Sequence, residues 1–194
     1  MGELPEALGE LKQLRRLCFG GDSGHHNKSL KRLPDSLGDL ESLEELVLDK
    51  CKVLQAIPVS ISKCTNLIRL SMKECKAIIQ LPDGLGFCSK LVELSLMKCV
   101  ALTSLPESVG SLHALEELDL TKCRAIAQLP ETLVNLKCLS HLHLRDCTSL
   151  VHLPTKFHEI SSLYKLDCRN CSNLKVGKLT NPSLKELLAE GSLA

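Results

Sequence analysis

A proline that follows a leucine or isoleucine returns every 24 residues along most of this 194-residue chain. The members of this series are Pro34, Pro58, Pro82, Pro106, Pro130 and Pro154, and Pro5 precedes the first of them by 29 residues. A fixed period of this length is typical of proteins that stack similar structural units, each of which cannot bury its apolar face alone. The chain is therefore expected to form an elongated array.

Further columns of residues keep the same 24-residue period and define the unit LxxLxLxxCxxLxxLPxxLGxLxx. Three leucine-rich columns begin at Leu43, Leu46 and Leu48, and a fourth column consists of Cys51, Cys75, Cys99, Cys123, Cys147 and Cys171. Apolar and polar residues alternate in the xLxLx segment, as in a half-buried strand. Proline then ends the strand and suits the start of a short helical turn, where an acidic residue usually follows it.

The first part of the unit resembles the leucine-rich repeat, in which the ninth position is asparagine or cysteine. Only 2% of the residues are aromatic while 44% are hydrophobic, so aliphatic side chains must fill the core. The resemblance implies an α/β repeat fold: a leucine-rich-repeat solenoid, or horseshoe, with a concave parallel β-sheet and short helical or irregular convex segments. We expect one domain over residues 1–194 with about eight repeats.

Both ends of the repeat series are irregular. A Gly-rich, polar insertion of five residues falls within residues 20–29 and is expected to be an exposed loop, whereas the last repeat is shortened. The segment at 183–187, SLKEL, has the pattern of one last strand. Because no polar capping segment is recognisable, the chain is expected to be part of a larger protein.

The eleven cysteines are expected to be free thiols in a reducing compartment. In the cysteine column the side chains run parallel, so they neither face one another for disulfides nor converge on a tetrahedral zinc ion. Each thiol is expected to hydrogen-bond local backbone. Cys168 and Cys171 form a CxxC, but both occupy core columns, as do Cys64 and Cys88. No metal or cofactor is expected.

Several classes of function are disfavoured. With 24 Lys and Arg against 23 Asp and Glu there is no basic patch for nucleic acid, and no apolar stretch is long enough to span a bilayer. No catalytic arrangement or phosphate-binding loop stands out, which indicates a binding module and not an enzyme. His141 and His143 have a spacing that could bind a metal ion, although membership of an exposed binding surface is the favoured interpretation.

The candidate binding site is the set of outward-facing residues in the last strands, because these vary while the core columns stay constant. Acidic residues around Glu117 and Asp119 adjoin basic ones from His141 to Arg169, and Arg145 and Arg169 are expected to hold carboxylates of a protein partner. The predicted site consists of Glu93, Met97, Glu117, Asp119, Thr121, His141, His143, Arg145, Lys165, Asp167 and Arg169.

Segments such as LPDSLGDLESLEELVLDKCKVL resemble the repeats of plant intracellular disease-resistance receptors, the nucleotide-binding leucine-rich-repeat proteins. The resemblance implies a cytoplasmic ligand-sensing module in defence signalling. Its partner would be a pathogen effector, a host protein or another domain of the same receptor. The alternative is a stand-alone intracellular scaffold of the Ras-group or phosphatase-regulator type.

Overall fold

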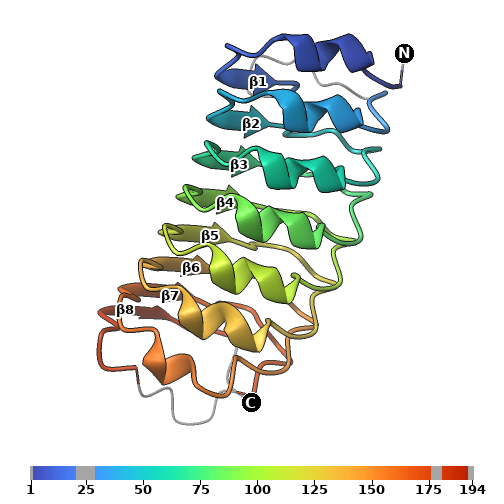
Figure 1. Cartoon of the computed structure of the whole chain (residues 1–194). Coiled ribbons are helices and arrows are strands. Elements are labelled where there is room, and N and C mark those ends of the chain that lie inside the picture. Colours follow the sequence, from blue (N-terminus) through green and yellow to red (C-terminus); the bar gives the residue numbers. More distant parts are fainter. Residues whose placement is uncertain (1, 21–28, 176–180, 192–194) are drawn as a thin grey trace.

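A computed structural model describes residues 2–20, 29–175 and 181–191. In these ranges eight strands form one parallel sheet in sequence order (Figure 1). The strands are β1 (Arg16–Cys18), β2 (Glu45–Val47), β3 (Arg69–Ser71), β4 (Glu93–Ser95), β5 (Glu117–Asp119), β6 (His141–His143), β7 (Lys165–Asp167) and β8 (Glu186–Leu188). This arrangement confirms the predicted leucine-rich-repeat solenoid.

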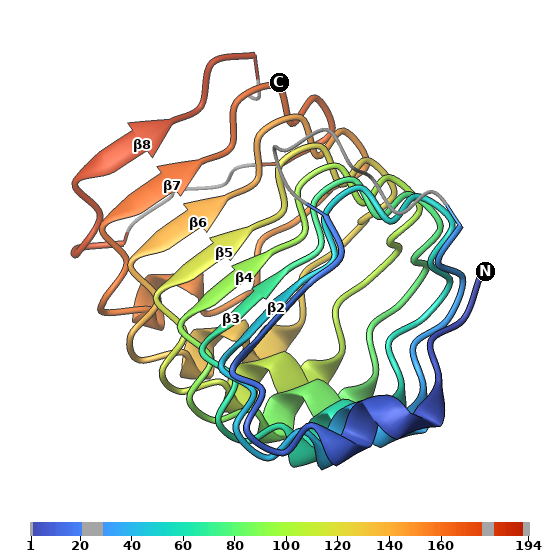
Figure 2. The same ribbon diagram turned by 90° about the horizontal axis from the view of Figure 1, so that it is seen from above.

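In the described residues, seven short 3-10 helices lie on the side of the rungs away from the sheet (Figures 1 and 2). These helices are η1 (Glu6–Glu10), η2 (Asp35–Asp39), η3 (Val59–Lys63), η4 (Asp83–Phe87), η5 (Glu107–Ser111), η6 (Glu131–Asn135) and η7 (Phe157–Glu159). Six of them begin at the residue after the repeat proline, one position later than predicted. Each of these prolines is the N-cap, with extended backbone, and its carbonyl accepts the first hydrogen bond of the helix, for example from Leu85 N–H to Pro82 at 3.0 Å.

The period of the sequence sets the register of the sheet. Leu70 pairs with Leu94, Leu94 with Leu118, and Leu118 with Leu142, so each strand aligns with the one 24 residues later. Leucines of the repeat columns therefore stack into a single core and are almost fully buried. β8 confirms the last predicted strand, whereas the expected loop within 20–29 and the shortened segment lie largely at 21–28 and 176–180, outside the described residues.

The residue before the cysteine of each full repeat adopts left-handed backbone, a feature that the repeat pattern did not indicate. Its φ lies between 59° and 64° at Lys50, Glu74, Lys98, Lys122, Asp146 and Asn170. Backbone N–H groups at these positions donate to a carbonyl of the next rung, for example from Lys122 to Arg145 at 2.7 Å. The hydrogen bonds between rungs offset a conformation that is costly for residues other than glycine.

Substitution of Gly86 is expected to force neighbouring rungs apart. A Cβ built there would lie 2.5 Å from the Ser108 backbone oxygen, closer than real Cβ contacts. Gly86→Ala should lower the free energy of unfolding by about 1–3 kcal/mol, the usual cost of overpacking. Ser89→Ala, at an exposed position of the same repeat, serves as the control in denaturant titrations. Equal stability of the two variants would contradict the close packing of η4 on η5.

Candidate protein-recognition surface

All eleven residues of the predicted site lie on the strand face of the sheet, in three columns that cross the strands. The first column runs Arg16, Glu45, Arg69, Glu93, Glu117, His141, Lys165 and Glu186; the second runs Cys18, Val47, Ser71, Ser95, Asp119, His143, Asp167 and Leu188. The third column follows the strand ends and contains Asp49, Lys73, Met97, Thr121, Arg145 and Arg169. We call this set the strand face.

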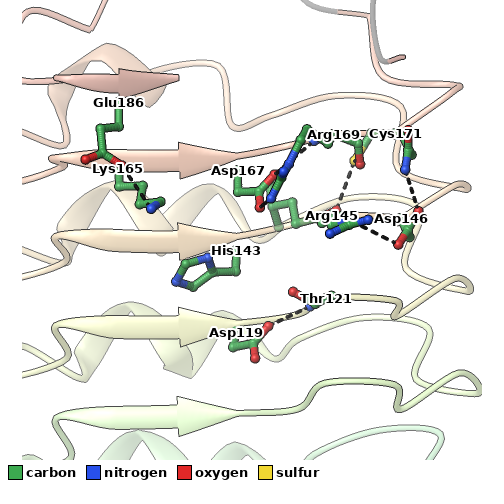
Figure 3. Close-up of polar contacts among 12 residues, drawn as sticks. Asp119, Thr121, His143, Arg145, Asp146, Lys165, Asp167, Arg169, Cys171 and Glu186 are labelled. Atoms are coloured by element: carbon green, nitrogen blue, oxygen red, sulfur yellow. Dashed lines mark hydrogen bonds and ion pairs between the residues drawn. The ribbon is translucent and has the colours of Figure 1, made fainter. Parts of the chain in front are cut away.

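The Arg169 guanidinium is occupied by a residue of the chain itself, contrary to the expectation that it would be free to hold a partner's carboxylate. Its Nε and Nη2 donate to the two carboxylate oxygens of Asp167 at 2.9 and 2.6 Å (Figure 3). Burial alone would raise the pKa of Asp167, but hydrogen bonds from Arg169 and the charges of Arg169 and His143 outweigh it and hold the pKa below its usual value. The pair therefore stabilises the surface.

Asp119 is partly buried and bonded, although its side chain was expected to be free in solvent. Its Oδ1 accepts the backbone N–H of Thr121 at 2.9 Å (Figure 3). Its Oδ2 accepts the Ser95 hydroxyl at 3.4 Å. Truncation of Asp119 would leave a backbone donor without its partner, which typically costs about 1 kcal/mol or more. Asp119→Ala is therefore expected to destabilise the protein, although Asp119 belongs to the outward-facing residues.

Other charges in β5–β7 also have partners within the chain. Lys165 Nζ lies 2.9 Å from Glu186, and Arg145 Nε lies 3.5 Å from Asp146 (Figure 3). Glu117 is half-exposed, with His143 Nε2 at 3.6 Å. The acidic and basic patches adjoin as the sequence indicated, but much of their charge is neutralised internally. Arg145 remains the most exposed cation among the predicted site residues of this region.

The rings of the histidine pair stack on each other. The rings of His141 and His143 stack at 6.3 Å, Tyr164 lies 6.1 Å from His141, and the Ser140 hydroxyl is 2.8 Å from His141 Nδ1. Among the residues that the structure describes, no group of three or more His, Cys, Asp or Glu side chains could hold a metal ion. The pair therefore contributes ring surfaces and nitrogen atoms for contacts.

A hollow of about 930 Å³ lies over β1–β4, at the other end of the strand face from most of the predicted site. We call it the N-terminal hollow. Met97 is the one predicted site residue that lines it. Its full lining is Arg16, Cys18, Gly20, Glu45, Val47, Asp49, Lys50, Arg69, Lys73, Glu74 and Met97.

Of the second column, Cys18 and Val47 line the hollow, whereas Ser71 and Ser95 do not. Val47, Ser71 and Ser95 occupy that column in β2–β4, whereas β5 and β6 carry the larger Asp119 and His143. Long side chains of the first column form one wall, joined by ion pairs from Arg16 to Glu45 at 2.7 Å and from Glu45 to Arg69 at 3.6 Å.

Cysteine thiols connect neighbouring repeats, which corrects the expectation of bonds to local backbone. Cys123 Sγ donates to the Leu96 carbonyl of the preceding repeat at 3.0 Å, and Cys147 bonds in the same way to Leu120. Cys64 and Cys88 make longer contacts of this kind, at 3.5 and 3.4 Å, beneath the 3-10 helices. All eleven cysteines are free of disulfides, as predicted.

Only Cys18 and Cys138 are exposed, so native protein is expected to expose two reactive thiols and denatured protein eleven. Burial removes the other thiols from reagents and opposes formation of the reactive thiolate. Titration with a chromogenic disulfide at pH 8, with and without denaturant and without reductant, measures both numbers. Fast native reaction of more than two thiols would show that the core is open; fewer than eleven in denaturant would show disulfides.

Comparison with known proteins supports the fold. No protein-family model and no curated protein sequence matches the chain. The leucine-rich-repeat domain of the type III effector XopL has a TM-score of 0.71 and 24% identity, over 97% of this chain and 73% of that one. No helix in the described residues is long and apolar enough to cross a membrane.

Two further solved structures illustrate the range of proteins with this fold. A leucine-rich-repeat protein of Leptospira interrogans has a TM-score of 0.57 and 23% identity over the whole chain, which spans 59% of that protein. The ectodomain of the Arabidopsis receptor kinase HAESA, in complex with an IDA peptide hormone, has a TM-score of 0.61 and 22% identity, over 96% of this chain and 32% of that one. The chain is a leucine-rich-repeat region.

Proposed function

We propose that the chain is a protein-recognition module, the ligand-sensing region of a cytoplasmic immune receptor of plant type. The repeats resemble those of that receptor class. The observation that carries the recognition role is the contrast between a constant leucine core and a strand face whose residues change from rung to rung. A rigid scaffold with variable outward residues suits recognition of a protein ligand. The solved HAESA complex, in which this fold binds a peptide hormone, supports the same role.

The receptor and the stand-alone scaffold differ in what precedes the repeats in the same reading frame. Sequencing of the full-length transcript decides between them. An in-frame nucleotide-binding domain upstream would support the immune receptor. A short transcript that encodes repeats alone would favour the scaffold of Ras-group or phosphatase-regulator type.

Reversal of charge at Arg145 is expected to weaken binding of a partner purified by affinity from host lysate. Arg145 is exposed and its pair with Asp146 is long, so its guanidinium can contact a partner's carboxylate. Arg145→Glu should raise the Kd at least tenfold, or about 1.4 kcal/mol, in titration calorimetry. Arg169→Glu is a poor choice because it would leave the buried Asp167 carboxylate beside a second negative charge.

The matched control for Arg145 is Lys137→Glu, an equal change of charge at an exposed position outside the strand face. It should leave the Kd within about twofold of wild type, as expected of a site outside the interface. A larger loss of binding from Lys137→Glu than from Arg145→Glu would place the interface elsewhere and overturn strand-face recognition.

A further inference from the structure

The charges that line the N-terminal hollow do not balance. Four cationic side chains face three anionic ones; outside the lining, Lys98 binds the anion Glu74 at 2.9 Å and Glu93 binds the cation Arg69 at 3.2 Å. The hydrogen bond from Lys98 is the main reason why the pKa of Glu74 is lowered. In the described part of the chain, the ammonium groups of Lys50 and Lys73 have no carboxylate at ion-pair distance. The hollow therefore offers positive charge to a ligand.

Carboxylates within the hollow cannot easily supply the missing partner. Asp49 Oδ1 accepts the Ser71 hydroxyl at 2.6 Å and the backbone N–H of Lys73 at 2.8 Å, so it is used on the sheet itself. Glu45 is shared between Arg16 and Arg69. A ligand carboxylate near the two lysines would meet cations whose charge is not yet neutralised.

Two apolar side chains also line the hollow, the buried Val47 and the more exposed Met97. Val47 lies in the second column, and Met97 is half-buried at the edge of the hollow nearest β5. Methionine is flexible and polarizable, and adapts to side chains of different shape. A side chain next to the ligand carboxylate would therefore be apolar and would rest against Met97.

The neighbouring strand β5 presents the opposite charge. Glu117 is half-exposed and belongs to the first column, with only His143 as an ion-pair neighbour in the described residues. Parallel strands lie about 4.8 Å apart, so β3 and β5 are separated by about 10 Å, and the change of column adds to this distance. An extended peptide advances about 3.3 Å per residue, so a peptide that reaches from Lys73 to Glu117 needs about three to five residues.

We propose that the N-terminal hollow binds an extended peptide segment of a protein partner, with an acidic residue over Lys50 and Lys73, an apolar residue against Met97, and a basic residue over Glu117 three to five positions away. This inference rests on the proposed recognition function and names the chemistry of its ligand. The segment crosses the strands along the axis of the solenoid. The order of charged residues along the peptide, and not its apolar area, determines which segment binds.

The probe is a displayed library of random ten-residue peptides, selected on the immobilised full chain. Selected peptides are expected to contain acidic and basic residues three to five positions apart. The Kd of a selected peptide, measured by fluorescence anisotropy, should be at least tenfold higher for Lys73→Glu than for the wild type, and intermediate for Lys73→Met. For the exposed control Lys76→Glu it should stay within twofold of the wild-type value. Replacement of the acidic residue of the peptide by lysine should restore binding to Lys73→Glu.

The outcomes separate this inference from the proposed function. In one outcome, the selected peptides bind Lys73→Glu and Glu117→Lys with the same affinity as they bind the wild type, but bind Arg145→Glu more weakly. This result would overturn the hollow as the site and leave strand-face recognition intact. Failure to select any binding peptide, or selection of peptides insensitive to all these variants, would overturn both. Circular dichroism and denaturant titration of each variant exclude misfolding as the cause of a lost interaction.

Discussion

Above about pH 9 the free energy of unfolding is expected to fall steeply, because nine cysteines are buried as neutral thiols. Burial is the largest cause of each shift. It raises the pKa of Cys51, Cys64, Cys168 and Cys171 to about 11, that of Cys88, Cys99 and Cys147 to about 12, and those of Cys75 and Cys123 further.

The sign follows from proton linkage. An unfolded cysteine ionises near pH 8.5, whereas the folded thiols keep their protons to a higher pH. The contribution of the buried thiols to the free energy of unfolding is fully present below the pKa of the unfolded cysteines. It is lost as the pH rises from that value toward the pKa values of the folded thiols. Once the unfolded thiols are fully ionised, nine of them give a slope of about 12 kcal/mol per pH unit, enough to unfold a domain of ordinary stability within one unit.

Guanidinium titrations at pH 7, 8.5, 9.5 and 10 measure this slope, and the double variant Cys64→Leu, Cys88→Leu is its control. Leu40, Leu112 and Leu136 fill the same column in other repeats, so leucine suits both places. Removal of two ionising thiols should make the slope shallower by about 3 kcal/mol per pH unit. Because the two proteins differ only at these two thiols, an identical pH dependence would contradict the role of the thiols.

Truncation of Leu118 is expected to cost about 2–5 kcal/mol of unfolding free energy. Leu118 is fully buried in the middle strand β5, between Leu94 and Leu142 of the adjacent rungs. The cavity in Leu118→Ala cannot be filled easily, because both neighbouring rungs are held by their own strand pairing. Urea denaturation followed by circular dichroism measures the loss, which is a large part of the stability of an ordinary domain.

The control for Leu118 is Glu117→Ala, one residue earlier and half-exposed. It should change the unfolding free energy by about 0.5 kcal/mol or less, as surface substitutions usually do. Asp119 is unsuitable as the control because its carboxylate accepts the Thr121 N–H. Equal losses from Leu118→Ala and Glu117→Ala would mean that the assigned register is wrong.

By itself, the sequence determined the fold and the register of the strands. A period of 24 residues places each leucine of one repeat beside its counterpart in the next, as in the pairing of Leu94 with Leu118. Because the alternation of a strand has a period of two, the same pattern decided which residues face outward. The face that carries the candidate site, with Arg145 and Met97, was therefore predictable residue by residue.

Only the tertiary structure decided what that face offers to a ligand. Whether a cation is free or paired depends on side-chain directions and on distances of a few ångströms between rungs. The aligned repeat sequences do not contain this information. Arg169 is held by Asp167, whereas Lys73 has no carboxylate at ion-pair distance in the described residues. The N-terminal hollow likewise is lined by residues of four successive rungs, from Arg16 to Met97. Its place is a property of the packed sheet and not of any one repeat.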